Sequence, residues 1–235
     1  NLREKQTVYE NKDFSLIDLG EGIVCAEFHS KMNTIGADVL TGLNKAIDIA
    51  EERFDGLVVG NQGANFSVGA NLGMIFMLAV EQEYEELNAA IAYFQNTMMR
   101  MRYSGIPVIS APHGMCLGGG CELSLHADKV VASAETYIGL VEFGVGVIPG
   151  GGGTKEMTLR ASDAFKKNDV ELNILREHFL TIAMAKVSTS GHEAYDLGLF
   201  EKSKDVIVTN RDEQLSIAKS YARVLADAGY VKPIE

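Results

Sequence analysis

Three consecutive glycines in the middle of the chain, Gly118 to Gly120, constrain its fold more than any other feature. The residues after them predict a helix from about Gly120 to His126, so the glycines form a corner between a strand and this helix. A corner without Cβ atoms lets a ligand approach the backbone closely and leaves N–H groups free at the start of the helix. Glu122 falls in the first turn, beside that ligand position.

A second glycine-rich stretch, from Gly139 to Thr154, places another carboxylate, Glu142, in apolar surroundings. Residue chemistry alone leaves two interpretations open. Either the two glutamates lie at these glycine corners by chance, or they form a functional site. A glutamate in an apolar segment is costly unless it is paired or used, and this cost favours function.

Two common nucleotide-binding motifs are missing from the sequence. A phosphate-binding P-loop requires Gly-Lys-Ser/Thr, and the chain has no Gly-Lys pair. The near match to the dinucleotide pattern G-x-G-x-x-G begins at Gly144 and fails at Pro149. We therefore expect no nicotinamide dinucleotide site in these residues.

Short apolar segments alternate with amphipathic ones along the chain, which is typical of the α/β class. The patterns predict strands at 14–19, 23–28, 57–60, 108–111 and 129–132, and helices at 36–53, 81–102, 170–184 and 211–227. We expect a tail or linker over residues 1–13, followed by a single domain over residues 14–235.

Composition excludes some classes of partner. The net charge of −11 disfavours nucleic acid, because binding phosphates requires a basic surface. No uncharged apolar run is long enough to predict a membrane span, and no basic-then-apolar leader is visible. Three cysteines without a C-x-x-C pair indicate a reducing compartment, so we expect a cytoplasmic protein. The chain begins with Asn1, and we expect it to be a piece of a longer protein.

Three groups of motifs resemble those of the crotonase, or enoyl-CoA hydratase, superfamily. Residues 66–71 read F-S-V-G-A-N and are similar to F-x-x-G-A-D. Residues 107–122 contain P-V-I-S-A, then a glycine, then L-G-G-G-C-E, and are similar to P-V-I-A-A…G…L-G-G-G-C-E. Residues 138–154 are similar to F-G-x-P-E…G-x-x-P-G-x-G-G-T. The order of the motifs and the spacing between the two glutamates also match, and the resemblance covers about residues 14–208.

The resemblance implies a crotonase fold, which is a spiral of repeated β-β-α units. It implies that Glu122 and Glu142 are the catalytic pair and that the N–H groups of Ala70 and Gly119 form an oxyanion hole. It also implies contacts with the coenzyme A thioester or with the attacking water from Ala70, Asn71, Leu72, Gly73, Gly119 and Gly150.

The implied reaction is the addition of water to a trans-2-enoyl-CoA, which gives a 3-hydroxyacyl-CoA. Negative charge develops on the thioester oxygen, where two backbone donors stabilise it. One group takes a proton from water and another delivers a proton to the α-carbon. By the resemblance we assign Glu122 as the base and Glu142 as the proton donor. Coenzyme A is then part of the substrate, and we expect neither a separate cofactor nor a metal.

Three alternatives compete with a hydratase. An enoyl-CoA isomerase on the same fold works with essentially one carboxylate, at the position of Glu142. A non-catalytic acyl-CoA-binding domain would need neither carboxylate. A serine peptidase of the related Clp type needs a Ser/His/Asp constellation, which we do not find in the sequence. The presence of both glutamates favours the hydratase.

The chain departs from the family pattern in ways that affect its context. Asn71 replaces the usual Asp, and Val141 replaces the usual Pro. The expected role of both positions belongs to the backbone and not to the side chain. Residues 162–190 predict an atypical helical insertion, and the usual trimer is thereby in question, although we expect a homo-oligomer. Residues 69–77 look most like hydratase domains of multifunctional proteins of fatty-acid β-oxidation. This likeness implies a 3-hydroxyacyl-CoA dehydrogenase module in the full-length protein.

Overall fold

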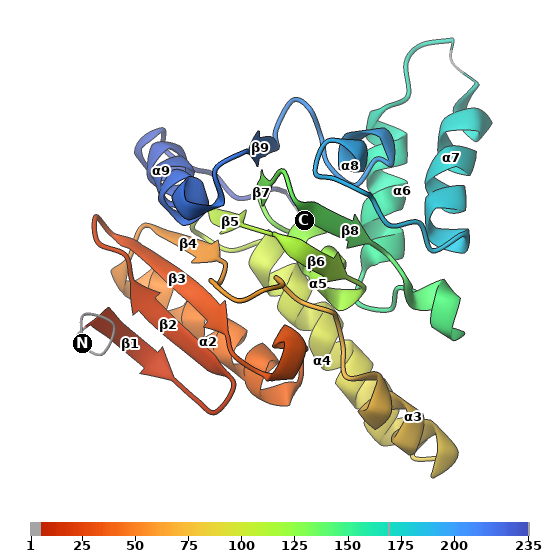
Figure 1. The fold of residues 1–235 in the computed structure, drawn as a ribbon, viewed down its shortest axis with the longest axis horizontal. Coiled ribbons are helices and arrows are strands. Elements are labelled where there is room, and N and C mark those ends of the chain that lie inside the picture. The colour runs from red at the N-terminus through yellow and green to blue at the C-terminus, as the bar shows by residue number, and fades with distance from the viewer. Residues whose placement is uncertain (1–5, 169, 235) are drawn as a thin grey trace.

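The computed structural model describes residues 6–168 and 170–234, and Figure 1 shows how their elements are arranged. The strands are β1 (Thr7–Glu10), β2 (Phe14–Asp18), β3 (Ile23–Phe28), β4 (Gly56–Val59), β5 (Val108–Ser110), β6 (Gly114–Leu117), β7 (Lys129–Ser133), β8 (Thr136–Gly139) and β9 (Val206–Val208). The helices are α2 (Ala37–Arg53), α3 (Leu72–Val80), α4 (Tyr84–Arg102), α5 (Gly119–Leu125), α6 (Gly153–Asp163), α7 (Glu171–Ala183), α8 (Glu193–Asp196) and α9 (Gln214–Asp227), with short 3-10 turns η1 (Lys31–Asn33), η2 (Glu142–Val145) and η3 (Arg211–Glu213).

Two sheets organise the described part of the chain. The larger sheet has the order β1-β2-β3-β4-β5-β7-β9, antiparallel over its first three strands and parallel from β3 onward. The smaller sheet is the parallel pair β6 and β8. Twice in succession, a strand of the large sheet is followed by a strand of the small sheet and then by a helix, as in β5-β6-α5 and β7-β8-α6. The structure therefore contains repeated β-β-α units.

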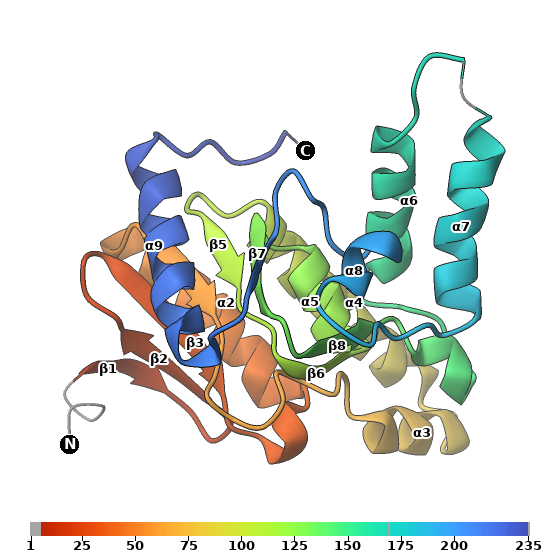
Figure 2. The same ribbon diagram turned by 45° about the horizontal axis from the view of Figure 1, so that its top comes forward.

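Both faces of the large sheet are buried. Alternate residues of β4 point to opposite sides, because side chains alternate along a strand: Leu57 joins the core beneath α2, α4 and α5, and Val58 joins the core beneath α9. Figure 2 shows α9 lying across this second face. The predicted α/β class is confirmed, and parallel strands covered on both faces account for the short, almost wholly apolar strand segments in the sequence.

Two expectations about elements were wrong in detail. The predicted tail over residues 1–13 contains β1, which pairs with β2 at the edge of the sheet, whereas residues 1–5 lie outside the described residues. The single helix expected over 81–102 is α4, preceded by a separate helix, α3, that none of the predicted elements covers. Each of these elements lies at the rim of the molecule, where few side chains are buried and a hydrophobic pattern is weak.

Candidate active site

The corner before α5 brings Glu122 into the interior. Gly118, between β6 and α5, has a φ of 53°, a conformation that favours glycine. A Cβ at Gly118 would lie 3.2 Å from Oε1 of Glu142. The corner therefore requires glycine both for its backbone conformation and for its close approach to Glu142. It leaves the Glu122 side chain almost fully buried in the first turn of α5.

The pairing of the two small strands explains why Glu142 lies beside Glu122. In the parallel pair β6 and β8, Leu117 is opposite Gly139, so the chain leaves both strands at the same edge. Glu142 opens η2 three residues after Gly139, and its side chain is buried. Its Oε2 has no hydrogen-bond partner within residues 6–168 and 170–234. The structure thus brings the two predicted glutamates close enough for the charge of Glu142 to act on Glu122.

Burial raises the pKa of both glutamates. Burial, and then the charge of Glu142, raise the pKa of Glu122 from 4.5 to about 8, and burial raises that of Glu142 to about 7. The N–H of Gly153 donates to Oε1 of Glu122 at 2.8 Å, and it lowers this pKa together with the N–H groups of Gly151 and Gly152. Carboxyls that interact this closely titrate as a pair, so the pair holds a proton near neutral pH.

Two free backbone donors lie next to each other at the start of α5. A Cβ at Gly119 would lie 3.3 Å from the nitrogen of Ala70, and a Cβ at Gly69 would lie 2.9 Å from the nitrogen of Gly119. Gly69 has a φ of 92°, so glycine is required there too. Within the described residues, neither the Ala70 nor the Gly119 N–H donates to another protein group. Two such donors side by side are what a developing oxyanion needs.

Phe94 of α4 forms a wall of this site that sequence reasoning did not identify. A Cβ at Gly119 would lie 2.9 Å from Cζ of Phe94, and a Cβ at Gly151 would lie 2.4 Å from its Cε1 and 2.5 Å from Oε2 of Glu122. Helical spacing marks Phe94 only as part of an apolar face, so nothing in the sequence separates it from core residues such as Met98.

Gly150, predicted to help hold the attacking water, is fixed by Gln95, a neighbour that no sequence motif indicates. Gln95 of α4 donates from Nε2 to the Gly150 carbonyl at 2.6 Å. A cavity of about 290 Å³ is lined by these two residues together with Met99, Lys155 and the adjoining loop residues. A larger cavity, of about 530 Å³, lies between the end of β4 and the start of α9 and contains none of the predicted site residues.

The predicted contacts after Ala70 form the beginning of α3. Asn71 is its N-cap, and Oδ1 of Asn71 accepts a hydrogen bond from the N–H of Met74 at 3.3 Å. Asn and Asp cap helices about equally well, so this geometry accounts for Asn in place of Asp. Leu72 is partly exposed, and Gly73 follows in the first turn. The contacts of these three residues with a substrate stay predictions.

Neither a metal-ligand cluster nor a membrane-spanning helix occurs within residues 6–168 and 170–234. No three His, Cys, Asp or Glu side chains there cluster closely enough to hold a metal ion. No described helix combines the length and apolar character that crossing a bilayer requires.

Comparison with known proteins identifies the family. Residues 19–166 match the family described as Enoyl-CoA hydratase/isomerase. The chain is 44% identical over 231 residues to a Bacillus subtilis protein named "Probable 3-hydroxyacyl-CoA dehydrogenase", covering 98% of this chain and 29% of that protein. It is 39% identical over 160 residues to a Rickettsia felis protein described as a fatty acid oxidation complex trifunctional enzyme, covering 68% of this chain and 22% of that protein. The chain thus spans less than a third of the length of these relatives.

Solved structures confirm the predicted crotonase fold. The crystal structure of an enoyl-CoA hydratase from Bacillus anthracis superimposes with a TM-score of 0.74 at 24% identity, covering 92% of this chain and 77% of that one. An enoyl-CoA hydratase structure from Geobacillus kaustophilus gives the same TM-score at 21% identity, covering 93% of this chain and 76% of that one. With the family match over more than half of its length, this chain belongs to the enoyl-CoA hydratase/isomerase family.

Proposed function

We propose that this chain adds water to the conjugated double bond of a trans-2-enoyl-CoA and gives a 3-hydroxyacyl-CoA. The observation that supports hydration most directly is the pair Glu122 and Glu142, two neighbouring buried carboxyls with raised pKa values. A binding domain has no use for this costly arrangement, and an isomerase needs only one of the two carboxyls.

The proposed reaction uses the free donors as well as the carboxyls. The thioester oxygen accepts hydrogen bonds from the N–H groups of Ala70 and Gly119, which stabilise the enolate that forms when water attacks carbon 3. The base removes a proton from the attacking water, and the protonated partner delivers a proton to carbon 2. The π bond between carbons 2 and 3 and one O–H bond of water are broken, and one C–O and one C–H bond are formed. The base ends with the proton from water, and the acid ends without its own.

The hydrogen bonds around the two carboxyls support a division of roles. Backbone N–H groups of Gly151, Gly152 and Gly153 stabilise the charged form of Glu122. Among residues 6–168 and 170–234, Oε2 of Glu142 has no hydrogen-bond partner, which suits a carboxyl that carries the proton during the reaction. We therefore assign Glu122 as the base and Glu142 as the acid in the substrate complex. Before substrate binds, the higher pKa of Glu122 keeps the shared proton mainly on Glu122, so this proton moves to Glu142 on binding.

The test is loss of the enoyl absorbance of crotonyl-CoA on incubation with the chain. We expect Glu122→Gln and Glu142→Gln each to reduce turnover by at least about 100-fold, the lower bound for a lost acid or base. Both variants keep the side-chain volume, so circular dichroism should match that of the wild type. Near-normal turnover by either variant removes that residue from the mechanism. Loss at Glu142 alone would favour an isomerase.

The relatives support a metabolic setting for the proposed reaction. Their names refer to fatty acid oxidation and to a 3-hydroxyacyl-CoA dehydrogenase. We infer that the substrate is a fatty acyl-CoA of β-oxidation and that the product passes to a dehydrogenase module of the longer protein. A cytoplasmic location and a homo-oligomeric state are parts of the same proposal, and the burial of Cys25, Cys116 and Cys121 as small apolar side chains agrees with a reducing compartment.

A further inference from the structure

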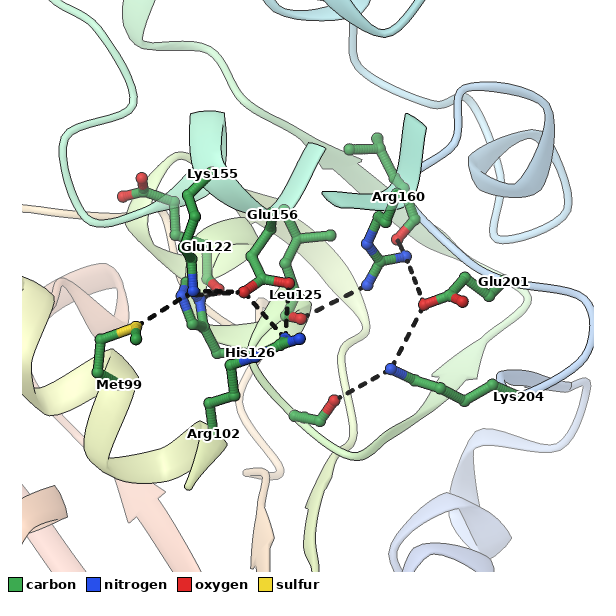
Figure 3. Close-up of polar contacts among 12 residues, drawn as sticks. Met99, Arg102, Glu122, Leu125, His126, Lys155, Glu156, Arg160, Glu201 and Lys204 are labelled. Carbon is green, nitrogen blue, oxygen red and sulfur yellow. Dashed lines mark hydrogen bonds and ion pairs between the residues drawn. The ribbon is translucent and has the colours of Figure 1, made fainter. Parts of the chain in front are cut away.

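A buried carboxylate behind Glu122, together with two partly exposed cations, takes no part in the proposed chemistry. Glu156, in the first turn of α6, is 2% exposed. Its two oxygens accept hydrogen bonds from Nη1 of Arg102 at 2.9 and 2.8 Å, and Nζ of Lys155 lies 2.6 Å from Oε1. Figure 3 shows these contacts converging on Glu156 from α4, α5 and α6. Burying charges is expensive even when they are paired, so stability alone explains this group poorly.

The ring of His126 lies between Glu156 and the backbone of Glu122, the residue proposed as the base. Its ring is fully buried at the end of α5, and Nδ1 lies 2.7 Å from the backbone carbonyl of Glu122, to which it donates. Nε2 lies 3.5 Å from Oε1 of Glu156 and has no hydrogen-bond partner among the described residues. Burial lowers the pKa of His126 to about 4, so the ring is neutral at neutral pH, with its proton on Nδ1.

The same ring supports the loop that donates to Glu122. Gly152 has a φ of 114°, and a Cβ there would lie 2.9 Å from Cε1 and Nε2 of His126. The backbone of Gly152 therefore lies directly against the ring. The next residue, Gly153, donates its N–H to Oε1 of Glu122. The position of these donors relative to the Glu122 carboxyl thus depends on how the start of α6 is held. The N–H of Glu156 donates to the Gly152 carbonyl at 3.0 Å, and the Glu156 side chain is anchored to Arg102 of α4.

We propose that Glu156 is a positioning residue, which anchors the start of α6 to Arg102 of α4 and so holds the N–H donors of Gly151 to Gly153 against the carboxyl of Glu122. The inference deepens the proposed hydratase function and rests on it only where turnover is measured. Positioning matters at this scale because a displacement of about 1 Å in an active site can cost up to about 100-fold in rate.

The charges around Glu122 and Glu156 indicate whether loss of Glu156 raises or lowers the pKa of Glu122. Glu122 is shifted by burial, by Glu142 of η2 and by the three N–H groups. Glu156 faces Arg102 of α4, Lys155 of its own helix and the neutral ring of His126, and the two cations lower its pKa against the effect of burial. Since those cations do not figure among the causes that shift Glu122, Glu156 should act on it through the donors. Loosening the donors raises the pKa of Glu122.

The experiment compares Glu156→Gln with Glu51→Gln, which also removes a carboxylate paired with an α4 arginine, but at the surface and away from α5. The side-chain carboxyl of Glu122 is titrated by ¹³C NMR in the substrate-free chain and assigned by its absence in Glu122→Gln. We expect Glu156→Gln to raise the titration midpoint by at least roughly half a pH unit, and Glu51→Gln to leave it unchanged. In turnover of crotonyl-CoA, kcat should fall about 10-fold with KM within about twofold, and the pH profile should move to higher pH.

A second variant keeps the test valid if Glu156→Gln does not fold. Arg102→Gln removes the same anchor from the α4 side while Glu156 keeps Lys155, and it should raise the same midpoint. An unchanged or lowered midpoint in the folded variants overturns the proposal, because a merely structural role would reduce thermal stability without moving the titration of Glu122. If the wild-type chain shows no hydration, the proposed function fails, whereas the titration still decides the role of Glu156.

Discussion

At the scale of single residues, Glu122 combines a catalytic proposal with a cost in stability. In the unfolded chain its pKa is about 4.5, whereas in the folded chain it is about 8. Below pH 4.5 the carboxyl is protonated in both states and the fold has its full stability. As the pH rises towards 8, the unfolded state loses its proton first, so the free energy of unfolding decreases. Functional residues often destabilise a fold in this way.

We therefore expect Glu122→Gln to be more stable than the wild type at pH 8.5, by on the order of 2 kcal/mol, and nearly equal to it at pH 4.5. Urea denaturation at the two pH values measures the difference directly. Equal stability of both proteins at every pH would mean that the Glu122 carboxyl is not held in its neutral form by the fold.

The oxyanion hole makes a second prediction at this scale, about Gly119. Gly119→Pro deletes the N–H at the first position of α5, a position where helices tolerate proline. Gly119→Ala is the matched control, because it adds a Cβ against Phe94 but keeps the N–H. We expect the proline variant to hydrate crotonyl-CoA at least about 100-fold more slowly than the alanine variant. Similar rates in two folded variants would exclude Gly119 as an oxyanion donor.

At the scale of elements, the packing of α2 on the sheet depends on one glycine. A Cβ at Gly42 would lie 2.3 Å from Cγ of Phe14 in β2. Phe14 is fully buried, and its ring also packs near Phe28 and Tyr9, so it has little room to move. Gly42 therefore permits a close approach of helix and sheet that any larger residue would prevent.

Gly42→Ala consequently has two opposing effects on the free energy of unfolding. Alanine should stabilise the helix by about 1 kcal/mol, but overpacking a core typically costs about 1–3 kcal/mol. Because the overlap with Phe14 is severe, we expect a net loss of about 1–2 kcal/mol in the free energy of unfolding. Lys45→Ala, at an exposed position of the same helix, should be nearly neutral. Thermal or urea denaturation of the two variants decides the sign, and a gain in stability from Gly42→Ala would contradict the packing argument.

The elements also reveal which parts of the fold the sequence predicts. Strands β2, β3, β4, β5 and β7 and helices α2, α4 and α9 follow from apolar patterns, because each buries a face against the core. Helix α7 was predicted from the same kind of pattern, but Thr181 is its only buried residue. Helix α3 is different, since its nine residues are apolar or glycine and none is fully buried. A helix without a buried face has no periodicity to detect. Strands β6, β8 and β9 are short and glycine-flanked or isolated, and their pairing depends on contacts far apart in the sequence.

The residues of the candidate site likewise fall into those that the sequence predicts and those that only the structure identifies. Glu122, Glu142 and the glycine corners were predicted because motifs mark them, and the structure brings both glutamates and both donors together. Glu156 and His126 were not predicted, because they are thirty residues apart in the sequence and neither lies in a motif of known chemistry. Only the packing of α6 on α5 joins them.

At the scale of the whole molecule, the chain covers 29% of its Bacillus subtilis relative and 22% of its Rickettsia felis relative. Any dehydrogenase activity suggested by those names must therefore be tested on this chain itself. The one near match to a dinucleotide fingerprint gives a structural reason to expect none here. Gly144 lies within η2, and Pro149 follows in a loop, so the segment does not connect a strand to the start of a helix as a dinucleotide-binding turn does.

We therefore predict hydration without hydride transfer. When the chain is given crotonyl-CoA and NAD, the enoyl absorbance should fall while no NADH absorbance appears, so that 3-hydroxybutyryl-CoA accumulates. Adding a separate 3-hydroxyacyl-CoA dehydrogenase should then produce NADH at a rate limited by hydration, which verifies the product independently. NADH formed by the chain alone would contradict the assignment of its residues to one hydratase domain. If neither absorbance changes, the chain does not hydrate crotonyl-CoA, and acyl-CoA binding should then be measured by calorimetry. In that case the fold holds two buried carboxyls at a cost in stability without using them for hydration.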